Sequence, residues 1–106
     1  MCDTKPLSQK GSTYVNQCDA CDSIFLWHNN VMLTYTPEEF ASFIEVISGF
    51  AFAKCAQVFP DGEERLVIRT PQRFVSLAFA RKEWEDLHEA LAAAQHLRQV
   101  LALISG

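Results

Sequence analysis

Apolar, β-branched and aromatic residues lie on both sides of an asparagine pair in the first third of the chain. Apolar, β-branched and aromatic residues extend from Ile24 to Thr36, and Asn29-Asn30 lies in the middle of this run. Asparagine tolerates the positive φ that a tight two-residue hairpin turn requires. The pattern therefore predicts a β-hairpin that reverses at this pair.

The residues after this hairpin predict the start of a helix. Thr36 is a suitable N-cap, Pro37 suits the first helical position, and Glu39 can complete a capping box. Apolar residues then recur at helical spacing, at Phe40, Phe43, Ile44 and Ile47. Gly49 could end this helix, but the apolar stripe can also continue to about residue 57, so the pattern leaves the C-terminal boundary open.

The second half of the chain predicts two further strands and a long helix. A Pro-Asp-Gly turn at residues 60–62 precedes a strand over residues 66–70, and another strand covers residues 74–80. A helix is expected over residues 81–104. Its apolar stripe consists of Trp84, Leu87, Leu91, Leu97, Leu101 and Ile104.

The two halves of this predicted fold repeat each other weakly. The segment LTYTPEEFASFIEVI (33–47) aligns with LAFARKEWEDLHEAL (77–91) at an offset of 44 residues. Both segments carry a strand and then a helix start, which indicates two hairpin–helix (ββα) units. We therefore expect an α+β fold in which the four strands form one antiparallel sheet, with both helices packed on one face.

Strand alternation leaves a second face of this sheet that is rich in apolar side chains. The face is expected to carry Phe25, Trp27, Met32, Val67 and Phe74, beside Arg65 and Arg69. Exposed apolar patches beyond roughly a few hundred Å² usually mark an interface, so the pattern predicts contact with a second copy or with another protein. Alternatively, residues 1–16 or the segment around residues 50–59 fold back over this face.

Length and charge bound the domain count and the class of partner. The 106 residues, 49% of them hydrophobic, fit a single domain over residues 14–106, preceded by a mobile polar tail over residues 1–13. The net charge of −4 argues against nucleic acid as a partner. No segment has the apolar length of a signal-peptide core or a membrane span, so we expect a cytoplasmic protein without membrane contact.

Cys18 and Cys21 form a C-x-x-C pair just ahead of the predicted hairpin. This spacing lets two thiolates approach one ion from a tight turn, which makes zinc the candidate cofactor. A structural zinc site needs two more ligands, and the candidates are Cys55, Cys2 and His28. The expected site is therefore Cys₄ or Cys₃His.

Two other interpretations of the cysteine pair stay open. A redox pair needs a thiolate with a lowered pKa, which usually means a cysteine at a helix N-terminus. Here the residues after Cys21 are strand-like, and Asp19 and Asp22 disfavour a thiolate. In the remaining interpretation the pair is incidental and Cys55 is a small buried side chain.

The sequence lacks the familiar catalytic motifs. It contains no Gly-rich phosphate loop, no H-E-x-x-H and no G-x-S-x-G. His88 and His96 lie eight residues apart, which separates them by about 80° around a helix, so they do not converge as ligands. The acidic pairs lie at predicted helix starts or in a turn. These features favour a protein that is not an enzyme.

The pattern C-D-A-C-D followed by IFLWHNNVMLTYTPEEFASF, with the later ERLVIRTP, resembles an uncharacterised family of short bacterial proteins, a domain of unknown function. The resemblance covers about residues 17–91 and rests on the cysteine pair, the hairpin and the E-x-F-x-x-F helix. It implies a small stand-alone cytoplasmic protein without an established activity. The family pattern implies a glycine after the second cysteine; Asp22 departs from it, although aspartate can take the same left-handed turn.

Three hypotheses about function follow from these features. In the first, a dimeric α+β module that is not an enzyme binds structural zinc at its cysteine pair and makes its contact through the aromatic sheet face. In the second, Cys18 and Cys21 serve a thiol-based redox or sensor function. In the third, a metal-free interaction module uses the sheet face alone.

Overall fold

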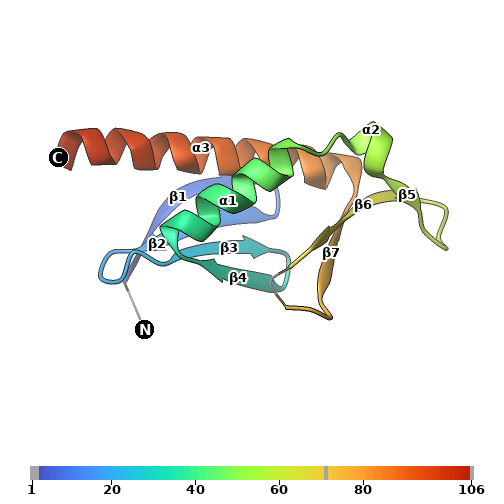
Figure 1. The fold of residues 1–106 in the computed structure, drawn as a ribbon, viewed down its shortest axis with the longest axis horizontal. Coiled ribbons are helices and arrows are strands. Elements are labelled where there is room, and N and C mark those ends of the chain that lie inside the picture. The colour runs from blue at the N-terminus through green and yellow to red at the C-terminus, as the bar shows by residue number, and fades with distance from the viewer. Residues whose placement is uncertain (1–2, 71, 106) are drawn as a thin grey trace.

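The fold consists of two antiparallel sheets and three helices (Figure 1). The computed structural model describes residues 3–70 and 72–105. The first sheet has the order β1-β2-β3-β4, with β1 at Thr4–Lys10, β2 at Thr13–Cys18, β3 at Ile24–His28 and β4 at Val31–Tyr35. The second has the order β5-β6-β7, with β5 at Gln57–Val58, β6 at Glu64–Arg69 and β7 at Ser76–Phe79. The helices are α1 at Pro37–Ser48, α2 at Phe52–Cys55 and α3 at Arg81–Ser105.

The predicted hairpin and the start of α1 are confirmed. β3 pairs with β4 across Asn29-Asn30, where Asn29 has a φ of 55°. The Thr36 hydroxyl accepts from the Glu39 N–H, and the Glu39 carboxylate accepts from the Thr36 N–H, which completes the capping box. α1 ends at Ser48 and α2 follows as a separate short helix, so the first helix does not run on to residue 57.

β6, β7 and α3 also lie close to their predicted ranges. α3 begins at the predicted Arg81, and the Glu83 carboxylate accepts from the Ala80 N–H at 2.9 Å, as in the first turn of α1. Among the residues that the structure describes, no helix combines the length and the apolar composition that crossing a membrane requires.

The N-terminal residues form a strand where the sequence indicated a tail. β1 pairs with β2 around the turn Gly11-Ser12, so the fold begins at Thr4 and the expected start near residue 14 is wrong. Only Leu7 of β1 is buried, because β1 is an edge strand, and a bulge around this residue shifts the register. The edge position and the bulge both remove the alternation of apolar and polar residues by which strands are predicted.

The strands of the two hairpin–helix segments do not form one sheet. β3 and β4 lie in the first sheet with β1 and β2, whereas β6 and β7 lie in the second sheet with β5. The expected single sheet of ββα units is therefore not the observed arrangement. The amphipathic repeat indicates a hairpin followed by a helix in each half, but the choice of neighbouring strand depends on residues 4–18, which the repeat does not include.

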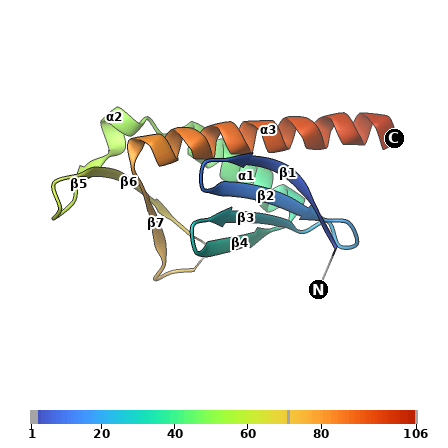
Figure 2. The ribbon, with the colours of Figure 1, turned by 180° about the vertical axis from the view of Figure 1, so that it is seen from behind.

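α3 lies across the inner face of the first sheet, over β1 and β2 (Figure 2). Leu87 and Ala94 of this helix are both 0% exposed. Full burial of a leucine side chain stabilises a fold by about 1.5–3 kcal/mol. The helix approaches β1 so closely that the Ser8 hydroxyl donates to the backbone oxygen of Ala90 at 2.6 Å.

The same helix also packs on the second sheet. The Trp84 ring meets the Phe79 ring edge-on, with 5.9 Å between the centroids. The inner face of the second sheet is buried at Leu66, Ile68, Leu77 and Phe79. Buried side chains of both sheets and all three helices thus form one continuous core.

We expect Gly11→Ala to destabilise the fold strongly. Gly11 has a φ of +56°, and a Cβ added there would overlap the Asp86 carboxylate. Positive-φ strain and the overlap together should lower the free energy of unfolding by about 2–5 kcal/mol. Gly62→Ala is the matched control, since Gly62 has a φ of +85° with nothing within 4 Å of an added Cβ. Gly62→Ala should lower the free energy of unfolding by about 1–2 kcal/mol. Urea denaturation measures the free energy of unfolding of both variants. Equal losses in the two would contradict the close approach of the Gly11 turn to α3.

Candidate functional site

The outer side of the first sheet carries uncharged and mostly large side chains, which we call the aromatic face. Strand alternation turns Ile24, Leu26 and His28 inward, where they are buried, and turns the residues between them outward. The aromatic face consists of Tyr14, Asn16, Phe25, Trp27, Met32 and Thr34. Tyr14, Trp27 and Met32 are direct neighbours across the strands and are 46%, 52% and 57% exposed.

The Trp27 ring is held in place on this face. Its Nε1–H donates to the carbonyl oxygen of Asn29 at 2.8 Å. The ring also lies against Tyr14, with 6.2 Å between the centroids. A large ring fixed in this way loses little conformational entropy when a partner covers it, so the face is suited to binding.

The other predicted interface residues lie on the second sheet. These are Arg65, Val67 and Arg69 in β6 and Phe74 in the turn before β7. Arg65 forms an ion pair with Asp61 at 2.9 Å, and this hydrogen-bonded contact lowers the pKa of the Asp61 carboxyl. The single apolar face expected from the sequence is therefore divided between two sheets, and only its residues in β3 and β4 belong to the aromatic face.

Neither segment that was expected to fold back covers the aromatic face with any of its described residues, 3–16 and 50–59. Residues 4–18 extend the first sheet sideways, so Tyr14 joins the face instead of burying it. The segment around residues 50–59 contributes α2 and β5, which lie with the second sheet at one end of the molecule (Figure 1). In the part of the chain that the structure describes, the aromatic face thus stays open to a partner.

Cys18 is the last residue of β2, and Cys21 lies in the turn that joins β2 to β3. The Cys21 N–H points at Cys18 Sγ at 3.4 Å. Cys18 is 1% exposed, whereas Cys21 is exposed. Asp22 has a φ of 60°, the left-handed conformation expected of an aspartate in place of glycine. The turn continues into a strand, so the pair lacks the helix N-terminus that a thioredoxin-like redox site uses.

The remaining predicted zinc ligands do not converge on this turn. Cys55 lies in α2, at the opposite end of the molecule from the β2–β3 turn (Figure 1). His28 is the last residue of β3 and is buried beside the hairpin turn. Cys2 lies outside the described residues. Within residues 3–70 and 72–105, no group of three or more His, Cys, Asp or Glu side chains could hold a metal ion.

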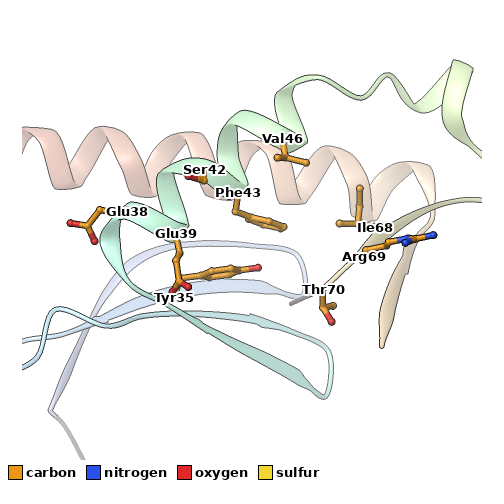
Figure 3. Close-up of a pocket in the computed structure, with 9 residues that line it drawn as sticks. All are labelled: Tyr35, Glu38, Glu39, Ser42, Phe43, Val46, Ile68, Arg69 and Thr70. Carbon is orange, nitrogen blue, oxygen red and sulfur yellow. The ribbon is translucent and has the colours of Figure 1, made fainter. Parts of the chain in front are cut away.

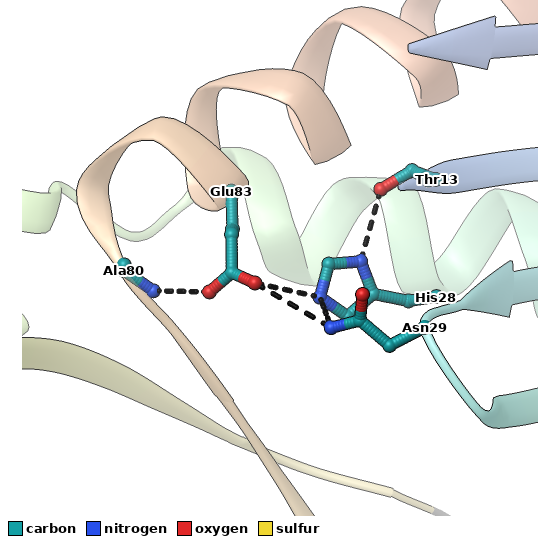
Figure 4. Close-up of polar contacts among 5 residues, drawn as sticks. All are labelled: Thr13, His28, Asn29, Ala80 and Glu83. Atoms are coloured by element: carbon teal, nitrogen blue, oxygen red, sulfur yellow. Dashed lines mark hydrogen bonds and ion pairs between the residues drawn. The ribbon is translucent and has the colours of Figure 1, made fainter. Parts of the chain in front are cut away.

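A buried polar cluster surrounds His28, and sequence reasoning missed it. His28 Nδ1 lies 3.1 Å from Thr13 Oγ1, and His28 Nε2 lies 3.5 Å from Glu83 Oε2 (Figure 4). The other Glu83 oxygen accepts from the Ala80 N–H. The cluster joins β2, β3 and the start of α3, which are far apart in sequence, so no local spacing indicated it.

This cluster has the hydroxyl, imidazole and carboxylate order of a catalytic triad, but its burial excludes that role. Thr13 is 0% exposed and His28 is 7% exposed, so a substrate cannot reach the hydroxyl that would act as the nucleophile. The His28 ring also packs on Phe79, with 4.8 Å between centroids. The cluster therefore fastens the first sheet to α3.

A cleft of about 470 Å³ lies between α1, the end of β4 and the end of β6 (Figure 3). Tyr35 in its wall is 4% exposed, and its hydroxyl has no hydrogen-bond partner among the described residues. Burial, with a smaller effect of Glu39, raises the pKa of Tyr35 to about 12, so the hydroxyl stays protonated and can donate. No sequence pattern indicated this cleft, because only the tertiary fold brings β6 beside α1.

We expect the protonation of His88 to make the fold less stable in mild acid. His88 packs edge-on against Trp84 at 4.8 Å, and its buried Nε2 has no hydrogen-bond partner among the described residues. Burial lowers the pKa of His88 below its usual 6.5, so the unfolded chain binds this proton more tightly. The free energy of unfolding should therefore fall as the pH drops below about 6.5.

Urea denaturation at several pH values between about 7 and about 5 measures this effect. His88→Gln should remove most of the fall, whereas His96→Gln, at an exposed position, should retain it. An equal fall in both variants would show that other groups cause the acid sensitivity.

Comparison with known proteins places the chain in a family. No curated protein and no solved structure matches it. The sequence profile of a family of unknown function, DUF6686, matches residues 1–105, a longer range than the residues 17–91 that carried the expected resemblance. Because the match covers nearly the whole sequence, the chain belongs to the family of unknown function DUF6686.

Proposed function

We propose that this protein is an interaction module and not an enzyme, and that its aromatic face binds the same face of a second copy. The observation that carries this proposal is the row of Tyr14, Trp27 and Met32, three large side chains that are each about half exposed on adjacent strands. Aromatic residues and methionine are enriched in protein interfaces, where they bury large areas. A contiguous row of them is unfavourable in water.

The absence of charge on the aromatic face favours a second copy as the partner. The chain has a net charge of −4, so two copies repel each other unless they meet through an uncharged surface. All six residues of the face are neutral, and the amide of Asn16 and the hydroxyl of Thr34 can hydrogen-bond across the contact. With a two-fold axis near Trp27, every residue of the face would contact a residue of the same face on the second copy.

The size of the face sets the expected strength of the dimer. Three strands of five or six residues carry the face. With about 4.8 Å between strands and about 3.3 Å per residue, the face measures about 10 by 20 Å. Standard interfaces bury about 800 Å² on each partner, which is more than this flat area. We therefore expect a dissociation constant on the order of micromolar.

We place this module in the cytoplasm. Cys18 and Cys55 are free thiols, and thiols persist in a reducing compartment. Nucleic acid is not the expected partner, because the aromatic face carries no lysine or arginine to contact phosphate.

Trp27→Asp should convert the dimer to a monomer. The change places a carboxylate at the centre of the face, where it would be buried beside its own copy, and this should weaken association at least about 100-fold. Trp27 is half exposed, so the variant should keep the fold, which circular dichroism checks. Size-exclusion chromatography with light scattering, over a range of protein concentrations, measures the mass.

Phe74→Asp is the matched control for this experiment. Phe74 is 92% exposed but lies on the second sheet, so its replacement should leave the dimer unchanged. The aromatic face is ruled out as the contact if the native protein is monomeric at all concentrations. A dimer that survives Trp27→Asp but dissociates with Phe74→Asp would rule it out equally.

Structural zinc binding at Cys18 and Cys21 is our second candidate function. The supporting observation is the Cys21 N–H that points at Cys18 Sγ, followed by the left-handed Asp22. Zinc binds cysteine as the thiolate, and this N–H would donate to the sulfur of such a ligand. Two thiolates supply half of a tetrahedral site, and the other half must come from outside the described residues or from a second chain. The redox or sensor alternative uses the same two thiols.

Elemental analysis of protein purified without a metal-affinity tag tests this second function. The native protein should carry about one zinc per chain, or one per two chains if the site is shared, and Cys18→Ser/Cys21→Ser should carry none. The variant should also unfold more easily, because zinc binding contributes to folding. A native protein that is metal-free and as stable as the variant would overturn zinc binding and leave the redox alternative, tested by the reactivity of the exposed Cys21.

A further inference from the structure

β4 is an edge strand with one side free. It pairs with β3, and no strand within residues 3–70 and 72–105 pairs with its other side. Figure 1 and Figure 2 both show β4 at the lower border of the first sheet. An edge strand presents a row of N–H and C=O groups to which another strand can bond.

The register of the sheet identifies the main-chain groups on this free side. In an antiparallel ladder each residue bonds the strand on one side only, and successive residues alternate between the two sides. The Cys18 N–H donates to the Ser23 oxygen at 2.8 Å, which fixes the alternation in the β2–β3 ladder. The same alternation continues through β3, so Leu33 of β4 bonds β3. The N–H and C=O groups of Met32 and Thr34 therefore point to the free side.

The other edge of this sheet is protected against strand addition, whereas the β4 edge is not. β1 contains Lys5, Pro6 and Lys10, and a bulge interrupts its register. Charged side chains, proline and bulges are the features by which edge strands resist pairing with another chain. β4 has the sequence VMLTY and a regular register with β3, so it has none of these features. It is the edge that can accept a further strand.

We propose that β4 binds an extended segment of another protein, which adds to the first sheet as an antiparallel strand. The segment carries apolar side chains at alternate positions and a basic residue near its N-terminal end. In such additions the main-chain hydrogen bonds supply affinity and the alternate side chains supply specificity. The contact uses the main chain of Met32 and Thr34, whereas the aromatic face uses their side chains, so it does not rest on the proposed dimer.

The inner side of the added strand selects apolar residues. Residues directly opposite each other in a ladder point to the same face, so the residues opposite Leu33 and Tyr35 point inward. Leu33 packs against the core but is only partly buried, so an apolar neighbour would complete its burial. Phe43 and Val46 of α1 lie above β4 in Figure 3, and Val46 is 54% exposed. These side chains offer an apolar surface to an inward-facing residue of the segment.

The charge of α1 favours a basic segment over a second copy of this chain. α1 follows β4 directly and carries Glu38, Glu39 and Glu45 without a basic residue. Glu38 is exposed and makes no ion pair or hydrogen bond with the described residues. An antiparallel strand begins beside the end of β4, so a lysine or arginine at its start lies near Glu38. A second copy would instead bring its own acidic α1 to this edge.

The synthetic peptide acetyl-Lys-Lys-Val-Thr-Val-Thr-Val-amide tests the proposal by NMR titration of the full chain. In the free protein the amides of Met32 and Thr34 should exchange with solvent faster than those of Leu33 and Tyr35, which bond β3. Saturating peptide should slow exchange at Met32 and Thr34 at least about tenfold, because both amides then donate to the added strand.

Two N-methylated forms of this peptide test the main-chain contact on the native protein. Methyl groups on both threonine nitrogens remove the donors that face Met32 and Thr34, so binding should weaken at least about tenfold. Methyl groups on two of the valine nitrogens, which point away from β4, are the matched control and should change binding less than about twofold.

The basic residues of the peptide are tested by their replacement. A peptide with two glutamates in place of the lysines should bind about fivefold more weakly at low salt, and the difference should shrink at high salt. Glu38→Gln should remove much of this preference for lysine. Glu85→Gln is the matched control, because Glu85 is exposed on α3, and it should keep the preference.

Thr34→Pro tests the edge from the side of the protein. Proline is tolerated on edge strands where its nitrogen faces away from the sheet, and the Thr34 N–H faces the free side. The variant should therefore keep the amide spectrum of the folded protein and bind the peptide about fivefold more weakly.

Four results would overturn this proposal. The first is unchanged amide exchange at Met32 and Thr34 with saturating peptide. The second is a threonine-methylated peptide that binds as tightly as the valine-methylated one. The third is equal binding of the lysine and glutamate peptides at low salt. The fourth is slow exchange at Met32 and Thr34 in the free protein that becomes faster on dilution, since a second copy would then occupy the edge.

Discussion

The packing of α3 across β1 and β2 is the contact on which the rest of the structure depends. Small side chains at Ala90 and Ala94 let the helix approach so closely that Ser8 reaches its backbone, and the turn at Gly11 closes over the Asp86 carboxylate. The two sheets share no strand pairing within the described chain. Packing on α3, and not a continuous ladder of strand hydrogen bonds, therefore holds the two sheets together.

The aromatic face and the cleft both follow from this arrangement. The helices cover the inner side of the first sheet, so its outer side has no second layer and carries the aromatic face. No strand lies between β4 and β6 in the part of the chain described, and the space that is left beneath α1 becomes the cleft with Tyr35 in its wall. The aromatic face is neutral and broad, which suits a protein surface.

Sequence patterns predicted the local structure correctly, but they failed where the structure depends on residues that are far apart in the sequence. The capping box at Thr36 and the turn at Asn29 depend on residues within a few positions, so the sequence is sufficient for them. β1 escaped prediction because only Leu7 of its seven residues is buried. The contact of His28 with Glu83 and the cleft beside Tyr35 depend on residues more than 30 positions apart in the sequence. The C-x-x-C spacing indicated a turn correctly, but spacing cannot tell whether further ligands reach it.

The contact between Ser8 and Ala90 spans 82 residues, and this separation has a consequence for biosynthesis. A ribosome makes β1 to β4 early and α3 only after every strand. At about 5–20 residues per second, roughly 4–14 seconds pass between the end of β1 and the start of α3. During this interval the first sheet lacks the helix that covers its inner side. The yield of the protein in a cell therefore depends on how well the unfinished chain is kept from other nascent chains, as well as on the stability of the finished one.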